Sequence, residues 1–169
     1  MKSKAKRAAV LGLLAASAAV ISVVESMLPA LSFMPPGFKL GLSNIITAYC
    51  AVSLSLPSAI FIVFFKSLIT LLFRGGMSAA MGLAGGVLSA AVMHLISRSK
   101  RVGIFGVIMA GGVVHNIAQV IVALGLIGQA ALFYLPVLIP LGAVCGAATA
   151  LLLRLAAPQI DKLFSGGKP

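Results

Sequence analysis

Acidic residues are almost absent from this 169-residue chain, which has only Glu25 and Asp161 beside thirteen Lys and Arg. Two isolated acids exclude the carboxylate clusters that usually hold Mg²⁺ at sites of diphosphate chemistry. The two cysteines, Cys50 and Cys145, lie inside apolar segments at no metal-binding or disulfide spacing. A GxxxxGK[ST] phosphate loop is also missing from the sequence, which excludes ATP hydrolysis by that route. We therefore predict no enzymatic activity, no cofactor and no metal site.

Charged residues of either sign are scarce, since they make up 9% of the sequence against roughly 25% in soluble domains. Apolar residues make up 61%, and the mean hydropathy is +1.18. A helix that spans a bilayer needs about 20 apolar residues, so the chain has room for about six spans and no soluble domain. The cations lie between apolar runs and do not alternate with aromatic residues on a polar surface, which argues against nucleic acid as a partner.

The apolar runs predict an all-α integral membrane protein, a single domain of six transmembrane helices over residues 1–169. The predicted helices cover approximately residues 8–28, 39–56, 58–73, 77–97, 102–127 and 130–156. Pro57 separates the second run from the third, and proline suits the first turn of a helix. Arg74-Gly75-Gly76 separates the third run from the fourth. The first run follows a basic N-terminus as in a signal peptide, but its length favours a retained first span.

The distribution of basic residues predicts the orientation of these helices, because loops rich in Lys and Arg stay in the cytoplasm. With the N-terminus inside, the inner side collects Lys2, Lys4, Lys6, Arg7, Arg98, Lys100, Arg101, Arg154, Lys162 and Lys168. The outer side collects only Lys39 and Arg74. We therefore predict a multi-pass protein of the bacterial cytoplasmic (inner) membrane with both termini in the cytoplasm.

Polar side chains at bilayer depth are costly and usually functional, and three of the predicted helices repeat one arrangement of them. Positions i, i+1 and i+4 are Ser43, Asn44 and Thr47 in the second helix, Lys66, Ser67 and Thr70 in the third, and His115, Asn116 and Gln119 in the fifth. At about 100° per residue, each of these polar trios lies within an arc of about 100°. A cavity open to the outside would gather the three polar trios, and this predicts a small-molecule site.

The predicted substrate-binding residues are Lys66, Asn44, Asn116, Gln119, His115, Glu25 and Lys39. The excess of positive charge favours an anionic or carbonyl-rich ligand. A structural role stays open for several of these residues. Glu25 is the only acid near Lys66 in the predicted membrane region, so the two form a candidate structural ion pair. Lys39 has the alternative of meeting lipid headgroups, and His115 that of being a satisfied core histidine.

Small residues recur at helix-packing spacing in the first predicted helix, where Ala8, Gly12 and Ala16 lie four apart. Ala15 and Ala19 lie beside them at the same spacing. Small residues let helices approach closely in a bilayer. The pattern predicts contact either with other helices of this chain or with the helix of a partner subunit.

The longest outer connection, residues 29–38, is apolar and rich in proline. One interpretation is a lid that folds back over the outer mouth of the site, with Pro35, Pro36 and Gly37 in it. The other is a stiff connector that lies in the membrane interface.

The segment PGFKLGLSNI, from Pro36 to Ile45, resembles the PGxKLGLxN signature of the bacterial Gx transporter family, also labelled heptaprenyl diphosphate synthase component I. Glu25-Ser26 and the order of the apolar runs fit the same family. That family is similar to the substrate-binding (S) subunits of energy-coupling factor (ECF) transporters, which have six helices and cytoplasmic termini. The resemblance implies that an alanine-rich face of the first helix contacts a transmembrane coupling subunit, and that the first outer loop helps to close the site.

Together, the sequence and the resemblance predict a membrane subunit that binds a small solute for import, either vitamin-like, flavin-like or quinone-related. Separate ATPase subunits would supply the energy. The alternative is a non-catalytic membrane accessory of polyprenyl diphosphate or menaquinone synthesis, as the second family label implies. Catalysis by the chain itself is disfavoured, because prenyl diphosphate synthases of the usual kind resemble soluble enzymes with aspartate-rich metal motifs. The single aspartate here lies near the C-terminus.

Overall fold

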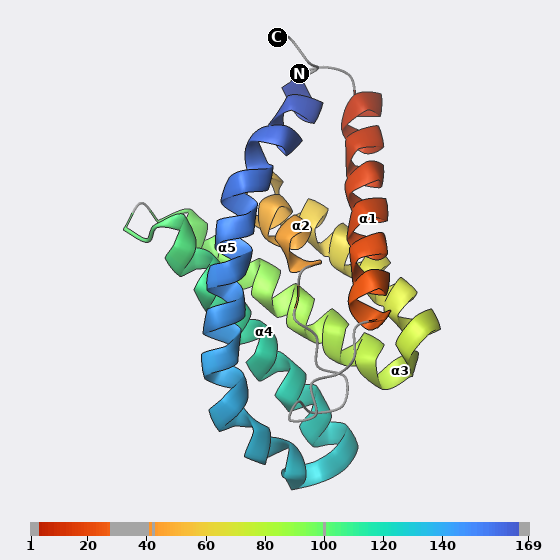
Figure 1. The fold of residues 1–169 in the computed structure, drawn as a ribbon, viewed down its shortest axis with the longest axis vertical. Coiled ribbons are helices and arrows are strands. Elements are labelled where there is room, and N and C mark those ends of the chain that lie inside the picture. Colours follow the sequence, from red (N-terminus) through yellow and green to blue (C-terminus); the bar gives the residue numbers. More distant parts are fainter. Residues whose placement is uncertain (1–3, 28–40, 42, 100, 166–169) are drawn as a thin grey trace.

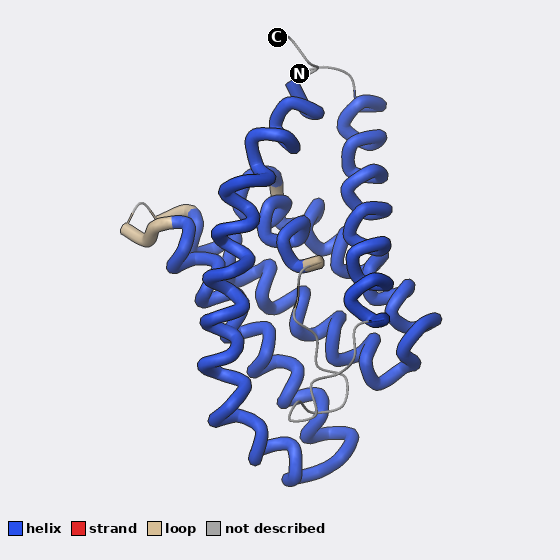
Figure 2. Tube along the Cα trace, in the orientation of Figure 1, coloured by secondary structure: helices blue, strands red, loops and turns tan. Residues whose placement is uncertain are grey.

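The structure is a computed structural model that describes residues 4–27, 41, 43–99 and 101–165. All regular elements in this part of the chain are helical (Figure 2). In chain order they are α1 (Lys4–Met27), α2 (Asn44–Tyr49), the π-helix η1 (Cys50–Leu54), α3 (Leu56–Ser97), α4 (Ile104–Ile127), the 3₁₀-helix η2 (Gly128–Tyr134) and α5 (Leu135–Ser165).

α3 is 42 residues long but consists of two helical arms joined at Gly75, which has φ 80° and ψ 176°. Glycine adopts this left-handed conformation readily because it has no Cβ. A straight helix of this length would extend about 63 Å, twice the roughly 30 Å of a bilayer core. The sharp bend of α3 in Figure 1 divides it into residues 56–74 and 76–97, each about as long as the bilayer core is thick. The break falls where Arg74-Gly75-Gly76 predicted a boundary.

Ser55 starts α3 as its N-cap, and its side chain accepts a hydrogen bond from the Ser58 backbone N–H at 3.4 Å. Pro57 lies in the first turn, where its missing N–H costs no helical bond. Local chemistry therefore explains why the chain turns between η1 and α3 without a charged loop.

Two of the other helices differ in length from the sequence-based expectation. α2 and η1 together cover only Asn44–Leu54, against the predicted 39–56, because Gly41 just before them has a left-handed φ of 82°. α5 continues to Ser165, beyond the predicted end near residue 156. An apolar run marks only the part of a helix that lipid can surround. A helix can continue beyond that part with polar residues such as Asp161, so the run does not mark the helix end.

Among the described residues, three stretches of helix are long and apolar enough to cross a membrane: Lys4–Glu25, Leu56–Ser97 and Ile104–Phe164. The second contains both arms of α3, and the third contains α4, η2 and α5. Large apolar side chains cover the outside of the bundle, among them Leu72 and Phe133, which are 74% and 85% exposed. This surface suits lipid, and the fold is that of an all-helical membrane protein.

α4 packs against α3 on one side and α5 on the other. Glycines make the contact with α5 very close. A Cβ added to Gly142 would lie 2.8 Å from the Gly112 carbonyl oxygen, and one added to Gly146 would lie 2.7 Å from Met109 Cα. The glycines of α4 and α5 therefore serve packing within the chain, as is common where lipid offers no hydrophobic drive for helix association.

The start of α1 and the end of α5 lie at the same end of the molecule (Figure 1). Lys6 Nζ donates a hydrogen bond to the Phe164 carbonyl oxygen at 3.3 Å. Beside this contact, the Tyr49 hydroxyl donates to Asp161 Oδ1 at 2.6 Å, and the Tyr49 ring stacks on Phe164 at 6.4 Å between centroids. The end of α2 is thus tied to the end of α5.

η1 is held by α3 at the same end of the molecule. His94 Nδ1 lies 2.8 Å from the Ala51 carbonyl oxygen, and Arg98 Nη2 lies 3.0 Å from His94 Nε2. Arginine can only donate, so Nε2 accepts and Nδ1 carries the proton that is donated to Ala51. The imidazole therefore bridges the arginine and the π-helix.

Candidate functional site

Glu25 holds the start of α2 against α1. The Gly41 backbone N–H donates to Glu25 Oε1, and the Ser43 hydroxyl donates to Glu25 Oε2 at 3.3 Å. The Glu25 side chain is only 5% exposed. A buried carboxylate is tolerated where hydrogen bonds satisfy it, and here those bonds also fix the position of the first turn of α2.

Lys66 contacts the same turn from the first arm of α3. Its side chain is 6% exposed, and Nζ donates to Asn44 Oδ1 at 2.6 Å. One turn further along, the Thr70 hydroxyl donates to the Lys66 carbonyl oxygen at 3.0 Å. The cation and the Glu25 carboxylate are therefore joined through the first turn of α2, at Asn44 and Ser43 respectively.

A polar cavity of about 20 Å³ lies between α2, α3 and α4. Members of all three polar trios line it. The lining residues are Gly41, Ser43, Asn44, Lys66, Ser67, Thr70, Ser78, Gly82, His115 and Gln119. Within the described ranges, the buried Ser67 hydroxyl has no hydrogen-bond partner.

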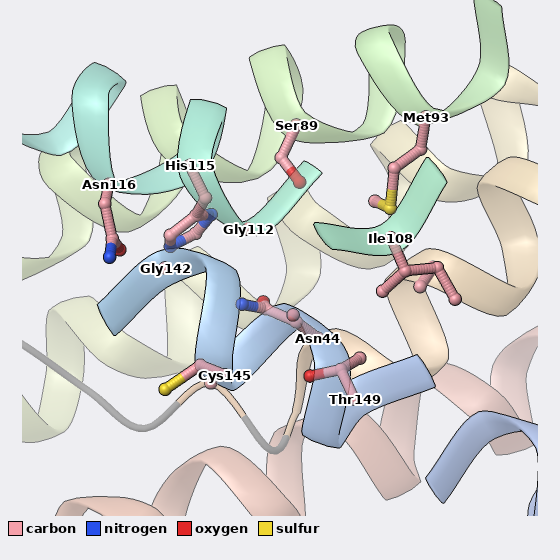
Figure 3. A pocket seen from close by; sticks show the side chains of 13 residues that line it. Asn44, Ser89, Met93, Ile108, Gly112, His115, Asn116, Gly142, Cys145 and Thr149 are labelled. Atoms are coloured by element: carbon pink, nitrogen blue, oxygen red, sulfur yellow. The ribbon is translucent and has the colours of Figure 1, made fainter. Parts of the chain in front are cut away.

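A second cavity of about 30 Å³ adjoins the polar cavity and shares Gly41, Asn44 and His115 with it. Figure 3 shows its side chains, which come from α2, α3, α4 and α5. The remaining lining residues are Ala48, Ser89, Met93, Ile108, Gly112, Asn116, Gly142, Cys145, Gly146 and Thr149. We call it the mixed cavity, because apolar side chains and glycine backbone alternate there with hydroxyl and amide groups.

α4 contributes side chains to both cavities. His115 stands directly over Gly85 of α3, where an added Cβ would lie 2.9 Å from His115 Cε1. Asn116 is 5% exposed and donates from Nδ2 to the Leu138 carbonyl oxygen of α5 at 2.7 Å. Asn116 thus combines a structural bond between helices with a place on the wall of the mixed cavity, whereas Gln119 lines the polar cavity.

Comparison with known proteins agrees with this architecture. The chain matches the family described as heptaprenyl diphosphate synthase component I over residues 14–155. It belongs to this family. A search of curated proteins gives no match.

The fold of this family member is similar to that of the S component of a bacterial ECF transporter. The TM-score is 0.76 at 19% sequence identity, and the match covers 96% of this chain and 99% of the other. The resemblance predicted from PGFKLGLSNI is confirmed, both for the family and for the type of fold.

Most of the sequence-predicted site residues come together in this family member. Lys66, Asn44, His115 and Gln119 line the polar cavity, and Asn116 lines the mixed cavity. Glu25 lines neither cavity and instead anchors α2 through Gly41 and Ser43. Lys39 and the predicted lid residues Pro35, Pro36 and Gly37 lie outside the described residues.

The small residues of α1 divide into two faces. Ala15 and Ala19 are 3% and 7% exposed, so in this structure their contacts are internal to the bundle. Ala8, Gly12 and Ala16 are exposed, and a Cβ added to Gly12 would meet no atom within 4 Å. Only this second face is available to another protein.

Several cavity residues were not anticipated from the sequence. Gly41 was noticed only as part of the PGFKLGLSNI segment, although its positive φ sets the entry into α2. Ser89, Cys145 and Thr149 are isolated in apolar runs, where no repeated spacing distinguishes them from ordinary helix residues. Gly112 lines the cavity through its backbone, which leaves no polar signal in the sequence.

The site is built for binding, because it offers hydroxyl, amide, imidazole and ammonium groups on a mostly apolar frame. Among the described residues no group of three His, Cys, Asp or Glu is placed to hold a metal ion. Ligand pockets usually measure roughly 300–1,000 Å³, and the two cavities of about 30 and 20 Å³ are far smaller. A small organic molecule would fit only after the helices or side chains around the cavities move apart.

Proposed function

We propose that this protein is the substrate-binding membrane subunit of an ECF-type importer, which takes up a small solute from outside the cell. The observation that carries the proposal is the convergence of polar side chains from α2, α3 and α4 on two adjoining cavities. The S-component-like fold supports the same conclusion. The protein would not be an enzyme, and separate ATPase subunits would energise it.

In this proposal the binding layer consists of Lys66, Asn44, His115, Asn116 and Gln119, with Glu25 holding α2 in register. Lys39 would contact the solute from the rim, and residues 29–38 would close over the site. Because the described cavities are small, solute entry requires these walls to part, and a lid would then enclose the bound molecule.

The proposed topology is a single domain with six spans and both termini in the cytoplasm of a bacterium. Support comes from the break at Gly75, which divides α3 into two arms of membrane length. The contact between Lys6 and Phe164 supports it too, because an even number of spans would bring the start of α1 and the end of α5 to the same side of the membrane.

The proposed partner is a transmembrane coupling subunit that contacts the exposed face of α1. Ala8, Gly12 and Ala16 present almost no side chain there, so a partner helix can approach the backbone closely. The alternative, an accessory role in polyprenyl diphosphate or menaquinone synthesis, predicts a prenyltransferase as the partner instead.

Affinity purification in mild detergent, followed by mass spectrometry of proteins and extracted small molecules, distinguishes these partners. We expect a membrane coupling subunit, ATPases and a low-mass solute. Recovery of a prenyltransferase without coupling subunit or ATPase would refute the importer.

A matched pair of variants makes this purification specific to the α1 face. Gly12→Leu adds bulk to the exposed small-residue face, and we expect it to reduce recovery of the coupling subunit. Val24→Leu changes an α1 residue that is 55% exposed, already large and about 120° around the helix from Gly12, and we expect recovery at the wild-type level. Equal recovery with both variants would show that the partner binds elsewhere.

A further inference from the structure

We infer that the solute is a monoanionic carboxylate with an apolar body, whose carboxylate lies at Lys66 and Ser67 and whose body occupies the mixed cavity. The inference rests on the proposed function, since it identifies the chemical class that the same site would take. It also excludes prenyl diphosphates, which the family description would suggest as ligands.

The charge of the cavities favours a single negative charge. Of the described residues that line either cavity, Lys66 is the only Lys, Arg, Asp or Glu. The Lys66 ammonium group would attract an anion placed beside Nζ. A cationic solute would be repelled. A diphosphate carries several negative charges and normally requires several cationic donors or a metal ion.

Hydrogen-bond capacity at the same place fits a carboxylate. The Ser67 side chain is 6% exposed and lines the polar cavity, and its hydroxyl has no partner in the described part of the chain. Buried hydroxyl groups are normally satisfied, so an orphan facing a cavity points to a missing acceptor. A carboxylate has two oxygens, one to accept from Lys66 Nζ and one to accept from the Ser67 hydroxyl.

The apolar body follows from the neighbouring mixed cavity. Asn44 and His115 lie between the two cavities, and beyond them Met93, Ile108 and Ala48 form an apolar wall. Figure 3 shows Met93 and Ile108 at the end of this cavity away from His115 and Asn116. A molecule that reaches from Lys66 past Asn44 would therefore have a charged head and an apolar remainder.

The direct test is equilibrium dialysis with the full-length protein in lipid nanodiscs, corrected with empty nanodiscs. The probes are 2-naphthoate, its neutral amide, 2-naphthyl phosphate and farnesyl diphosphate. We expect saturable binding of 2-naphthoate and at least about 10-fold weaker binding of the amide, because a charge-assisted hydrogen bond is lost. No saturable naphthoate binding, or tighter binding of the amide, phosphate or diphosphate, would overturn the inference.

Two pairs of variants test the assigned atoms. Ser67→Ala removes a hydroxyl that makes no hydrogen bond within the described structure, so stability should not fall while naphthoate affinity does. Thr47→Val is its control, because the Thr47 hydroxyl is also buried without a described partner but lines neither cavity. Lys66→Met should weaken naphthoate about 10- to 100-fold, and Lys162→Met, at an exposed cation of α5, should not. Equal affinities within each pair would contradict the assignment.

The compound retained by the purified protein separates this inference from the proposed function. If coupling subunits copurify but the retained compound is neutral, cationic or phosphorylated, the importer stands and the carboxylate is wrong. If naphthoate binds through Lys66 and Ser67 but only a prenyltransferase copurifies, the carboxylate stands and the importer is wrong.

Discussion

Gly41 fixes the position of Asn44 and therefore the geometry of the candidate site. Its φ of 82° is left-handed, and an added Cβ would lie 2.8 Å from Asn44 Nδ2. We expect Gly41→Ala to strain the backbone by about 1–2 kcal/mol. The new methyl group would also push the Asn44 amide away from Lys66 Nζ. Solute affinity should therefore fall about 10-fold, measured by dialysis with the retained solute or with 2-naphthoate.

Gly128→Ala is the matched control for Gly41→Ala. Gly128 also has a left-handed φ, 73°, but a Cβ there would meet no atom within 4 Å. Both variants should lose similar stability, whereas only Gly41→Ala should lose affinity. Equal affinities would show that Gly41 serves the fold and not the site.

At the residue scale, helical periodicity grouped polar side chains of three helices, and members of each polar trio line the polar cavity. The i, i+1, i+4 spacing grouped the polar residues around Asn44, Lys66 and His115 on one face of each helix. This grouping is predictable because the angle between side chains around a helix axis depends only on their spacing in the sequence. The role of Glu25 was not predictable, since its bonds to Gly41 and Ser43 depend on how the chain returns to α1 after a long connection. Isolated cavity hydroxyls such as Ser89 leave no periodic signal.

At the scale of whole helices, the close contact between α4 and α5 depends on glycine residues. A Cβ on Gly146 would lie 2.7 Å from Met109 Cα and 2.9 Å from the Ile108 carbonyl oxygen, both backbone atoms. Relief would therefore require the two helices to separate. We expect Gly146→Ala to destabilise the protein by about 1–3 kcal/mol, as overpacking does, and to lower the midpoint of thermal unfolding followed by circular dichroism in detergent.

Gly125→Ala gives the comparison for that measurement. Gly125 is exposed in α4, and an added Cβ would meet no atom within 4 Å. Alanine has the higher helix propensity, by about 1 kcal/mol, so the midpoint should be unchanged or higher. A midpoint for Gly146→Ala equal to that of Gly125→Ala would mean that the helices do not pack as described.

Helix ends were harder to predict than helix existence, and the physical reason differs between elements. The break in α3 was visible because Gly75-Gly76 interrupts a helix where no tertiary contact is needed to bend it. The π-helix η1 was not visible, since its Ala51 carbonyl is satisfied by His94, which lies 43 positions later in the chain. The 3₁₀-helix η2 likewise leaves no signal in the pattern of hydrophobic residues.

At the scale of the whole molecule, the net charge of +11 is distributed along the chain in a way that predicts one orientation. Arg98, Arg101 and Arg154 are exposed, and the proposed topology places them on the cytoplasmic side together with Lys6. The sequence predicts this asymmetry without any knowledge of packing, because it depends only on the order of charges and apolar runs. Insertion into the membrane sets which side these cations face.

Single cysteines placed at the two ends test the orientation. Arg101 and Gln129 are both exposed, and the proposed topology places them in the cytoplasm and outside the cell respectively. In intact spheroplasts a membrane-impermeant maleimide should label Gln129→Cys and leave Arg101→Cys unlabelled, whereas permeabilised cells should label both. The native chain gives the background, since Cys50 is buried and Cys145 partly buried. Labelling of Arg101→Cys in intact spheroplasts, with Gln129→Cys protected, would invert the topology and place the start of α2 on the cytoplasmic side, which is incompatible with solute capture from outside.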